Sequence, residues 1–65
     1  MRVPKYRSFL GKTQKDFAEL LNISVQAYWN KENGRTPFND VEKKIIKDLI
    51  QTEFPDITYE ELFFN

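Results

Sequence analysis

Two amide side chains, Gln26 and Asn30, have the residue type and spacing best suited to recognition chemistry in this chain. Residues four apart on a helix lie one turn apart on the same face. A glutamine amide presents a donor beside an acceptor, which matches N6 and N7 of adenine in the DNA major groove, and Asn30 can reach a base edge or a phosphate. Val25 offers only methyl groups, which suit a thymine methyl. These side chains therefore have the chemistry that contact with base edges requires.

Side chains that perform catalysis are scarce. The chain has no histidine and no cysteine, which removes the commonest general base, the commonest metal ligand and all thiolate chemistry. The adjacent Glu60 and Glu61 would point about 100° apart on a helix and cannot form a facing acid–base pair. There is no Gly-rich phosphate loop and no nucleophile beside a base. We therefore expect no enzyme, no cofactor and no bound metal.

Length and composition indicate one small folded domain over residues 1–65, because 40% of the residues are apolar and 15% are aromatic. No run approaches the ~18 apolar residues of a membrane span. The N-terminus has charge but no apolar signal core. We expect a cytoplasmic protein with no membrane partner.

Charge is unevenly distributed although the net charge is zero. Residues 1–37 hold seven basic and three acidic side chains, and residues 38–65 hold three basic and seven acidic ones. A dipolar domain of this kind can turn its basic end toward phosphate and its acidic end away. Neutrality overall therefore does not exclude a nucleic-acid partner. Such half-chain bias is also common in proteins that have no such partner.

Two short helical patterns place the recognition residues. The first begins at Thr13, whose hydroxyl can cap it, and ends at Asn22, which tolerates a left-handed cap. The second begins at the capping Ser24 and runs to about Asn33, where Gly34 ends it. The first helix has an apolar stripe made of Phe17, Ala18, Leu20 and Leu21. Two helices joined by so tight a turn form a helix-turn-helix, which sets its second helix into the major groove.

Three further helices are expected around this pair. The first covers about 4–11, with Pro4 at a position where its missing N–H is no loss. Another follows a loop and ends near Phe54, forced by Pro55, and a last helical turn comes after residue 58. The expected caps are Asn39 or Asp40, and Thr58 with Glu61. The expected core residues are Tyr6, Phe9, Leu10, Phe38, Val41, Ile45, Ile46, Leu49 and Ile50.

The stretch TQKDFAELLNISVQAYWNKENG, residues 13–34, resembles the helix-turn-helix of the Cro/CI-type (XRE) phage repressors. It shares that family's Thr-Gln opening, the alanine at 18, the Ile-Ser exit from the turn and the Glu-Asn-Gly ending. The resemblance implies an all-α, compact four- to five-helix domain of the lambda-repressor type, working near the nucleoid of a bacterial or phage-infected cell. It implies base contacts from Ser24, Val25, Gln26 and Asn30, and backbone contacts from Lys12, Gln14, Lys15, Asn33 and Arg35.

The resemblance also implies an ion pair between Arg7 and Glu32, tying the first helix to the end of the recognition helix. The alternative is that Arg7 is an exposed cation near phosphate. We favour the ion pair. Lys15 has an equally simple alternative as a solvated helix lysine.

Three features depart from the family or resist assignment. Trp29 can stack along the sugar–phosphate wall or pack on a neighbouring helix, and burial statistics favour a core or semi-core position. Lys31 replaces a usually apolar residue, and we expect its stem over the core with the ammonium outside. The apolar tail of Leu62, Phe63 and Phe64 either closes the core or forms a self-association patch.

The leading hypothesis is a sequence-specific double-stranded DNA-binding transcriptional regulator, most like a small Cro-type repressor, with its recognition helix over about 24–33. It would act as a homodimer on an operator with half-sites one helical turn apart. The competing hypothesis is a protein-interaction module, a modulator or antirepressor that keeps the fold and binds another regulator. The zero net charge, Trp29 and the apolar tail favour that alternative.

Overall fold

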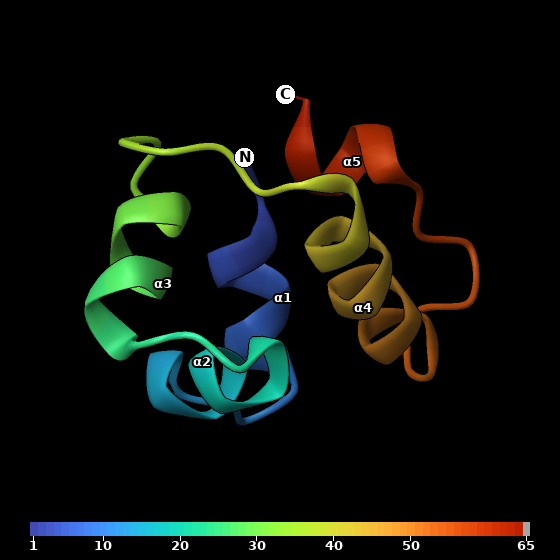
Figure 1. Cartoon of the computed structure of the whole chain (residues 1–65). Helices are drawn as coiled ribbons and strands as arrows, with labels where there is room; N and C mark the ends of the chain where they lie inside the picture. Colours follow the sequence, from blue (N-terminus) through green and yellow to red (C-terminus); the bar gives the residue numbers. More distant parts are fainter. Residues whose placement is uncertain (65) are drawn as a thin grey trace.

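Five α-helices and no strand make up the part of the chain that the computed structural model describes, residues 1–64. They are α1 (Val3–Phe9), α2 (Gln14–Leu21), α3 (Val25–Glu32), α4 (Asp40–Gln51) and α5 (Tyr59–Phe63). The predicted all-α class is confirmed. In Figure 1, α3 stands at the left edge and α4 and α5 at the right, with α1 between them. Over residues 1–64, no helix combines the length and the apolar character needed to cross a membrane.

Reciprocal caps start the two helices with the clearest sequence signals. At α2, the Thr13 hydroxyl accepts from the Asp16 N–H at 3.1 Å and the Asp16 carboxylate accepts from the Thr13 N–H at 2.8 Å. Asn39 and Glu42 make the same exchange at α4, with distances of 2.8 and 2.9 Å. Each box satisfies two backbone groups that a helix start leaves without partners. The predicted start of α2 is confirmed, and Asn39 rather than Asp40 caps α4.

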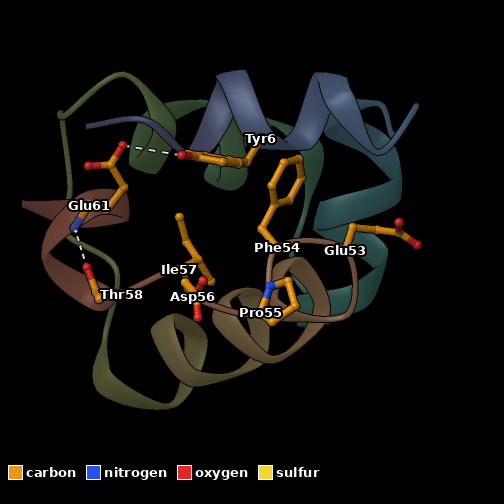
Figure 2. Close-up of a pocket in the computed structure, with 8 residues that line it drawn as sticks. All are labelled: Tyr6, Glu53, Phe54, Pro55, Asp56, Ile57, Thr58 and Glu61. Carbon is orange, nitrogen blue, oxygen red and sulfur yellow. Dashed lines mark hydrogen bonds between the residues drawn. The ribbon is translucent and has the colours of Figure 1, made fainter.

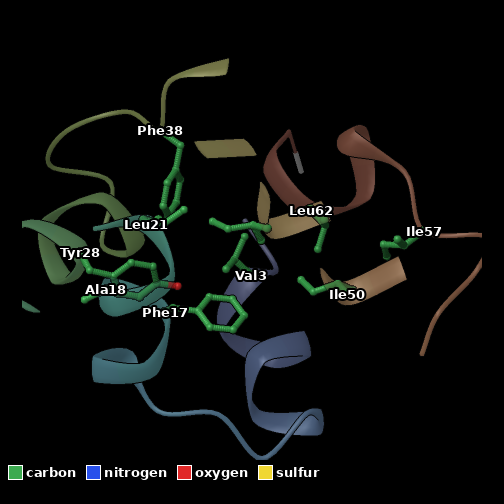
Figure 3. Close-up of a cluster of buried hydrophobic side chains, with 10 residues drawn as sticks. Val3, Phe17, Ala18, Leu21, Tyr28, Phe38, Ile50, Ile57 and Leu62 are labelled. Carbon is green, nitrogen blue, oxygen red and sulfur yellow. The ribbon is translucent and has the colours of Figure 1, made fainter. Parts of the chain in front are cut away.

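The core forms where all five helices meet, between the α2–α3 pair and α4–α5 (Figure 3). Tyr28 is its central aromatic, edge-on to Phe17 at 5.9 Å between ring centres and tilted against Phe38 at 5.9 Å. Phe38 is buried, as predicted, and anchors the loop between α3 and α4. The other buried apolar residues are Val3, Ala18, Leu21, Ile46, Ile50, Ile57 and Leu62.

The first helix differs from its prediction in both bounds and face. It spans Val3–Phe9 rather than 4–11, and Val3 is fully buried while Phe9 is 66% exposed. With 100° per residue, Phe9 lies roughly 120° around the helix from Val3, outside the buried direction. A helix of two turns contacts its neighbours along one edge only, so Phe9 is left outside.

The fourth helix also departs from its prediction. It ends at Gln51 instead of near Phe54, because the Thr52 and Glu53 N–H groups bond carbonyls three residues back, at 3.2 and 3.1 Å, and the chain turns before Pro55. Val41 is 68% exposed, whereas the neighbouring Glu42 is only 8% exposed. Ile46 sets the inward direction of α4. Relative to Ile46, Val41 points roughly 140° away and Glu42 roughly 40° away.

Candidate functional site

A three-residue turn, Asn22–Ser24, joins α2 to α3. Asn22 has φ 57° and ψ 45°, the predicted left-handed cap of α2. The Ile23 N–H bonds the Ala18 carbonyl at 3.0 Å, and the Ser24 hydroxyl accepts from the Ala27 N–H at 3.0 Å. Both helix ends are thereby satisfied within the turn, which sets α3 at a defined angle to α2.

A polar cluster around Glu32 connects three helices, and we call it the Glu32 hub. The carboxylate accepts hydrogen bonds from Arg7 Nε at 2.9 Å and Nη2 at 3.1 Å, from the Tyr28 hydroxyl at 2.7 Å and from Gln14 Nε2 at 2.9 Å. The side chains of Arg7 and Glu32 are 14% and 5% exposed. Arg7 also donates to the Lys12 carbonyl at 2.9 Å. The expected Arg7–Glu32 pair is present, and it fixes the last turn of α3 to α1 and α2.

The hub keeps its glutamate charged. Burial alone would raise the pKa of the Glu32 carboxyl, but the hydrogen bonds from Arg7, Tyr28 and Gln14 outweigh burial and hold that pKa below its ordinary value. Its hydrogen bond to Glu32 raises the pKa of Arg7. Burial, and then the bond to Glu32, raise the pKa of the Tyr28 hydroxyl. The hub therefore holds a fully formed ion pair and a neutral tyrosine at neutral pH.

The outward face of α3 is uncovered. Ser24, Val25 and Gln26 are exposed and Asn30 is partly exposed. Gln26 Nε2 donates to Asn30 Oδ1 at 3.3 Å, so the two amides lie together as the sequence predicted. Tyr28 faces the opposite way, into the core. The face offers amide, hydroxyl and methyl groups to an incoming molecule.

The residues expected at a DNA backbone fall into two groups. Lys12 and Lys15 lie exposed at the start of α2, and Arg35 lies exposed beyond the end of α3. Over residues 1–64, none of these three cations is in an ion pair. The two amides are engaged internally: Gln14 bonds the Glu32 hub, and Asn33 Nδ2 donates to the Trp29 carbonyl at 2.9 Å. Within residues 1–64, neither amide is hydrogen-bonded to any of the three cations.

Two residues on α3 make contacts that the sequence did not predict. Trp29 is 37% exposed, outside the core, and the Arg35 guanidinium carbon lies 5.2 Å from its ring centre. Its position, one residue beyond the inward Tyr28, turns it roughly 100° away from the core. The Lys31 ammonium is not free in solvent, because it bonds Glu42 Oε1 at 2.9 Å and the Pro37 carbonyl at 3.1 Å. Glu42 requires this partner, since a buried carboxylate without one is costly.

The C-terminal segment divides between core and surface. Leu62 is fully buried, and Phe63 is partly buried with its ring 5.6 Å from that of Phe38. Phe64 is 64% exposed and lies 4.7 Å from the Lys43 ammonium. The core expectation holds for Leu62, and in part for Phe63. The side chain of Phe64 stays available for an interface.

A groove that the sequence did not indicate runs between α1 and the loop from α4 to α5 (Figure 2). Its open space is about 500 Å³. The rings of Tyr6 and Phe54 meet edge to face at 5.0 Å, and the Tyr6 hydroxyl donates to Glu61 Oε1 at 3.3 Å. Its lining residues are Tyr6, Glu53, Phe54, Pro55, Asp56, Ile57, Thr58 and Glu61. They come from three separate segments, so no local pattern could reveal the groove.

The two candidate surfaces differ in chemistry. The α3 face carries neutral hydrogen-bonding groups flanked by exposed cations, whereas the groove has apolar walls and acidic edges. No family model, curated protein or solved structure matches the chain. The functional argument therefore depends on these residues and their geometry.

Proposed function

We propose that this chain is a sequence-specific double-stranded DNA-binding transcriptional regulator in which α2 and α3 act as a helix-turn-helix. The observation that carries the proposal is the division of α3 into two faces. Its inner face is fixed by Tyr28 and by the Glu32 hub, and its outer face leaves Gln26 and Asn30 open. A helix held rigidly with such a face outward suits the major groove.

Each residue has a distinct role in this proposal. Gln26 reads an adenine edge with its amide and Val25 contacts a thymine methyl. Ser24 and Asn30 supply further base contacts. The exposed cations Lys12, Lys15 and Arg35 neutralise phosphates. Gln14 and Asn33 hold α3 in position, and the segments that contain them lie against the DNA backbone. Contacts of the second kind set the position on the duplex without reading sequence.

The resemblance of residues 13–34 to Cro/CI-type repressors supplies the proposed mechanism. Two copies would bind a pseudo-palindromic operator with one α3 in each half-site, about one helical turn apart. Repression by occluding a promoter is the simplest mechanism for such a domain, and it requires no cofactor. This role places it in the cytoplasm, on the nucleoid. The exposed side chain of Phe64 offers an apolar surface for the second copy.

Selection of bound sequences from a random duplex pool, followed by gel shift, tests the proposal. The Gln26→Ala variant should lose about 1–3 kcal/mol of discrimination at one base pair in each half-site. Gln51→Ala is the matched control, because it removes the same amide from the end of α4, at the opposite side of the molecule. Circular dichroism should show both variants folded.

Either of two results would contradict this function. The pool could yield no enriched sequence at any salt concentration. Alternatively, the Gln26→Ala and Gln51→Ala variants could select the same sequences with equal affinity. Sedimentation of the protein with and without the selected duplex separately measures whether two copies bind.

A second candidate function, binding another regulator protein, draws on the groove between α1 and the α4–α5 loop. Its Tyr6 and Phe54 rings and the nearby exposed Phe9 are apolar, while Glu53 and Asp56 border it with negative charge. Partly exposed aromatic residues are typical of protein interfaces. This candidate is favoured over the first if no duplex shifts at any salt concentration.

A further inference from the structure

We propose that Trp29 and Arg35 form one composite contact to the sugar–phosphate backbone, a contact that strengthens binding without reading sequence. This inference depends on the proposed DNA-binding function and deepens it. We call the pair the Trp29–Arg35 stack. It assigns a role to the one aromatic residue on the outward face of α3.

The stack is open toward solvent. The Arg35 guanidinium carbon lies 5.2 Å from the centre of the Trp29 ring, within cation–π range. Trp29 is 37% exposed and Arg35 is also exposed. Within residues 1–64 the indole N–H donates no hydrogen bond, and the guanidinium has no carboxylate partner. Both groups therefore keep their hydrogen-bond donors for a ligand.

The stack lies on the same side of α3 as the proposed base contacts. With 100° per residue, Trp29 is roughly 40° around the helix from Val25 and roughly 60° from Gln26. It lies one turn further toward the C-terminus than Val25. A recognition helix meets base edges with its N-terminal residues. The later turn is therefore placed toward the wall of the groove.

Local hydrogen bonds hold both members in place. Asn33 Nδ2 donates to the Trp29 carbonyl at 2.9 Å, and the Arg35 N–H donates to the Asn30 carbonyl at 2.8 Å. Between them Gly34 takes φ 79°, which reverses the chain and brings Arg35 back over the ring. Because this geometry exists before binding, less conformational freedom is lost when a ligand arrives.

The chemistry of the stack fits a DNA strand. The face of an indole is apolar and suits the carbon surface of a deoxyribose, and a guanidinium edge matches a phosphate. The indole N–H is a further donor for a phosphate oxygen. Phosphates and sugars are alike at every base pair, so this contact should raise affinity equally for all sequences. A Trp–Arg pair also suits a protein partner, and the experiment below separates the two.

The tryptophan fluorescence of the intact protein reports directly on the stack, since the chain contains one tryptophan. The probes are the selected duplex and a scrambled duplex of equal length. We expect the Trp29 emission to change on binding either one. Trp29→Ala should weaken binding to both by about tenfold, a smaller loss than at an interfacial hot spot. Trp29→Phe should recover part of that loss, because it restores an aromatic face without the N–H.

Salt dependence tests the cation separately. Arg35→Gln should reduce the slope of log affinity against log salt by about 0.9, the value of one phosphate contact. Arg35→Lys should keep the slope but bind more weakly than the wild type, since an ammonium lacks the planar stacking edge. Lys44→Gln is the matched control. It removes one charge from the exposed Lys44–Asp48 pair on α4 and should leave the slope unchanged.

Three outcomes would overturn the inference. If Trp29→Ala changes which sequence is selected, the ring reads bases and the backbone role is wrong. If the wild type and Gln26→Ala behave as proposed but Trp29 emission and the Trp29→Ala affinity are unchanged, this inference fails and the proposed function stands. If no duplex binds the wild type and Trp29 emission instead responds to a protein partner, both fail.

Discussion

The two sides of the molecule are stabilised in different ways, and each leaves a different surface exposed. On the α2–α3 side, a buried ion pair with two neutral donors fixes α3, and the residues left outside combine amide and hydroxyl groups with apolar side chains. On the α4–α5 side, apolar packing around Ile46, Ile50 and Leu62 dominates, and the residues left outside include apolar ones such as Val41 and Phe64. Orientation by polar contacts thus leaves the hydrogen-bonding groups of the outward α3 face uncovered for recognition. Burial of aliphatic residues leaves apolar side chains at the edges.

The Glu32 hub is better understood as a device for orientation than as a source of net stability. Removing charges from water costs several kcal/mol per ion, and the pair regains this only through its full set of hydrogen bonds. Glu32 has four such bonds from three residues on α1, α2 and α3. Each bond has a narrow geometry, so together they allow α3 a single orientation.

Glu32→Ala should have the largest effect of any single change. It leaves the Arg7 guanidinium buried without a counter-charge, which costs about 3–5 kcal/mol and is comparable to the whole stability of so small a chain. Urea titration followed by circular dichroism measures the loss. The control is Asp48→Ala at the exposed Lys44–Asp48 pair, where about 0–1 kcal/mol is expected. Equal losses would show that the burial of the hub has no energetic consequence.

The tail provides the next test, between residues two positions apart. Leu62→Ala creates a cavity at a fully buried site and should cost about 2–5 kcal/mol. Phe64→Ala removes a larger side chain that is 64% exposed, and should change stability by within about 0.5 kcal/mol. Thermal unfolding of both variants gives the comparison. A large loss from Phe64→Ala would place its ring in the core.

Acid should weaken the α2–α3 side, and this is the smallest effect because protonation leaves the side chains in place. The pKa of Glu32 is lowered in the folded protein by its hydrogen bonds, against the opposing effect of burial. The pKa of Asp16 is lowered chiefly by the N–H and hydroxyl of Thr13. A carboxyl with a depressed folded pKa stabilises fully above its unfolded pKa and loses that contribution as pH falls through the folded value. Stability should therefore decline below the ordinary values of 4.5 for Glu32 and 3.8 for Asp16.

Urea titrations between pH 7 and pH 3 measure this decline. In the Asp16→Asn variant, the slope of stability against pH should be shallower, because one of the two titrating groups is gone. Lys44→Gln serves as a control on the α4 side and should keep the carboxyl-linked slope of the wild type. Identical slopes in the wild type and Asp16→Asn would show that the α2 capping box does not contribute to the pH dependence of stability.

The local sequence was sufficient to predict the helix class, the caps and the turn. The capping residues bond backbone groups only a few positions away, so their role does not depend on distant parts of the chain. They are Thr13 with Asp16, Asn22, Ser24 and Asn39. Helical spacing was equally sufficient to place Gln26 and Asn30 on one face, and the family resemblance predicted that this face points outward. The Arg7–Glu32 pair came from family resemblance, since nothing local relates two residues so far apart.

Only the tertiary structure decided which residues at the edge of each apolar face are buried and which polar side chains bond one another. Trp29, Val41 and Phe9 have the residue type of core members, but their exposure depends on which side of each helix packs against its neighbours. Lys31 bonds Glu42 because a loop brings the start of α4 beside the end of α3. The groove beside Tyr6 and the Arg35 guanidinium over Trp29 likewise join separate segments. Hydrogen bonds within one turn are encoded locally, whereas contacts between turns depend on the packing of the whole chain.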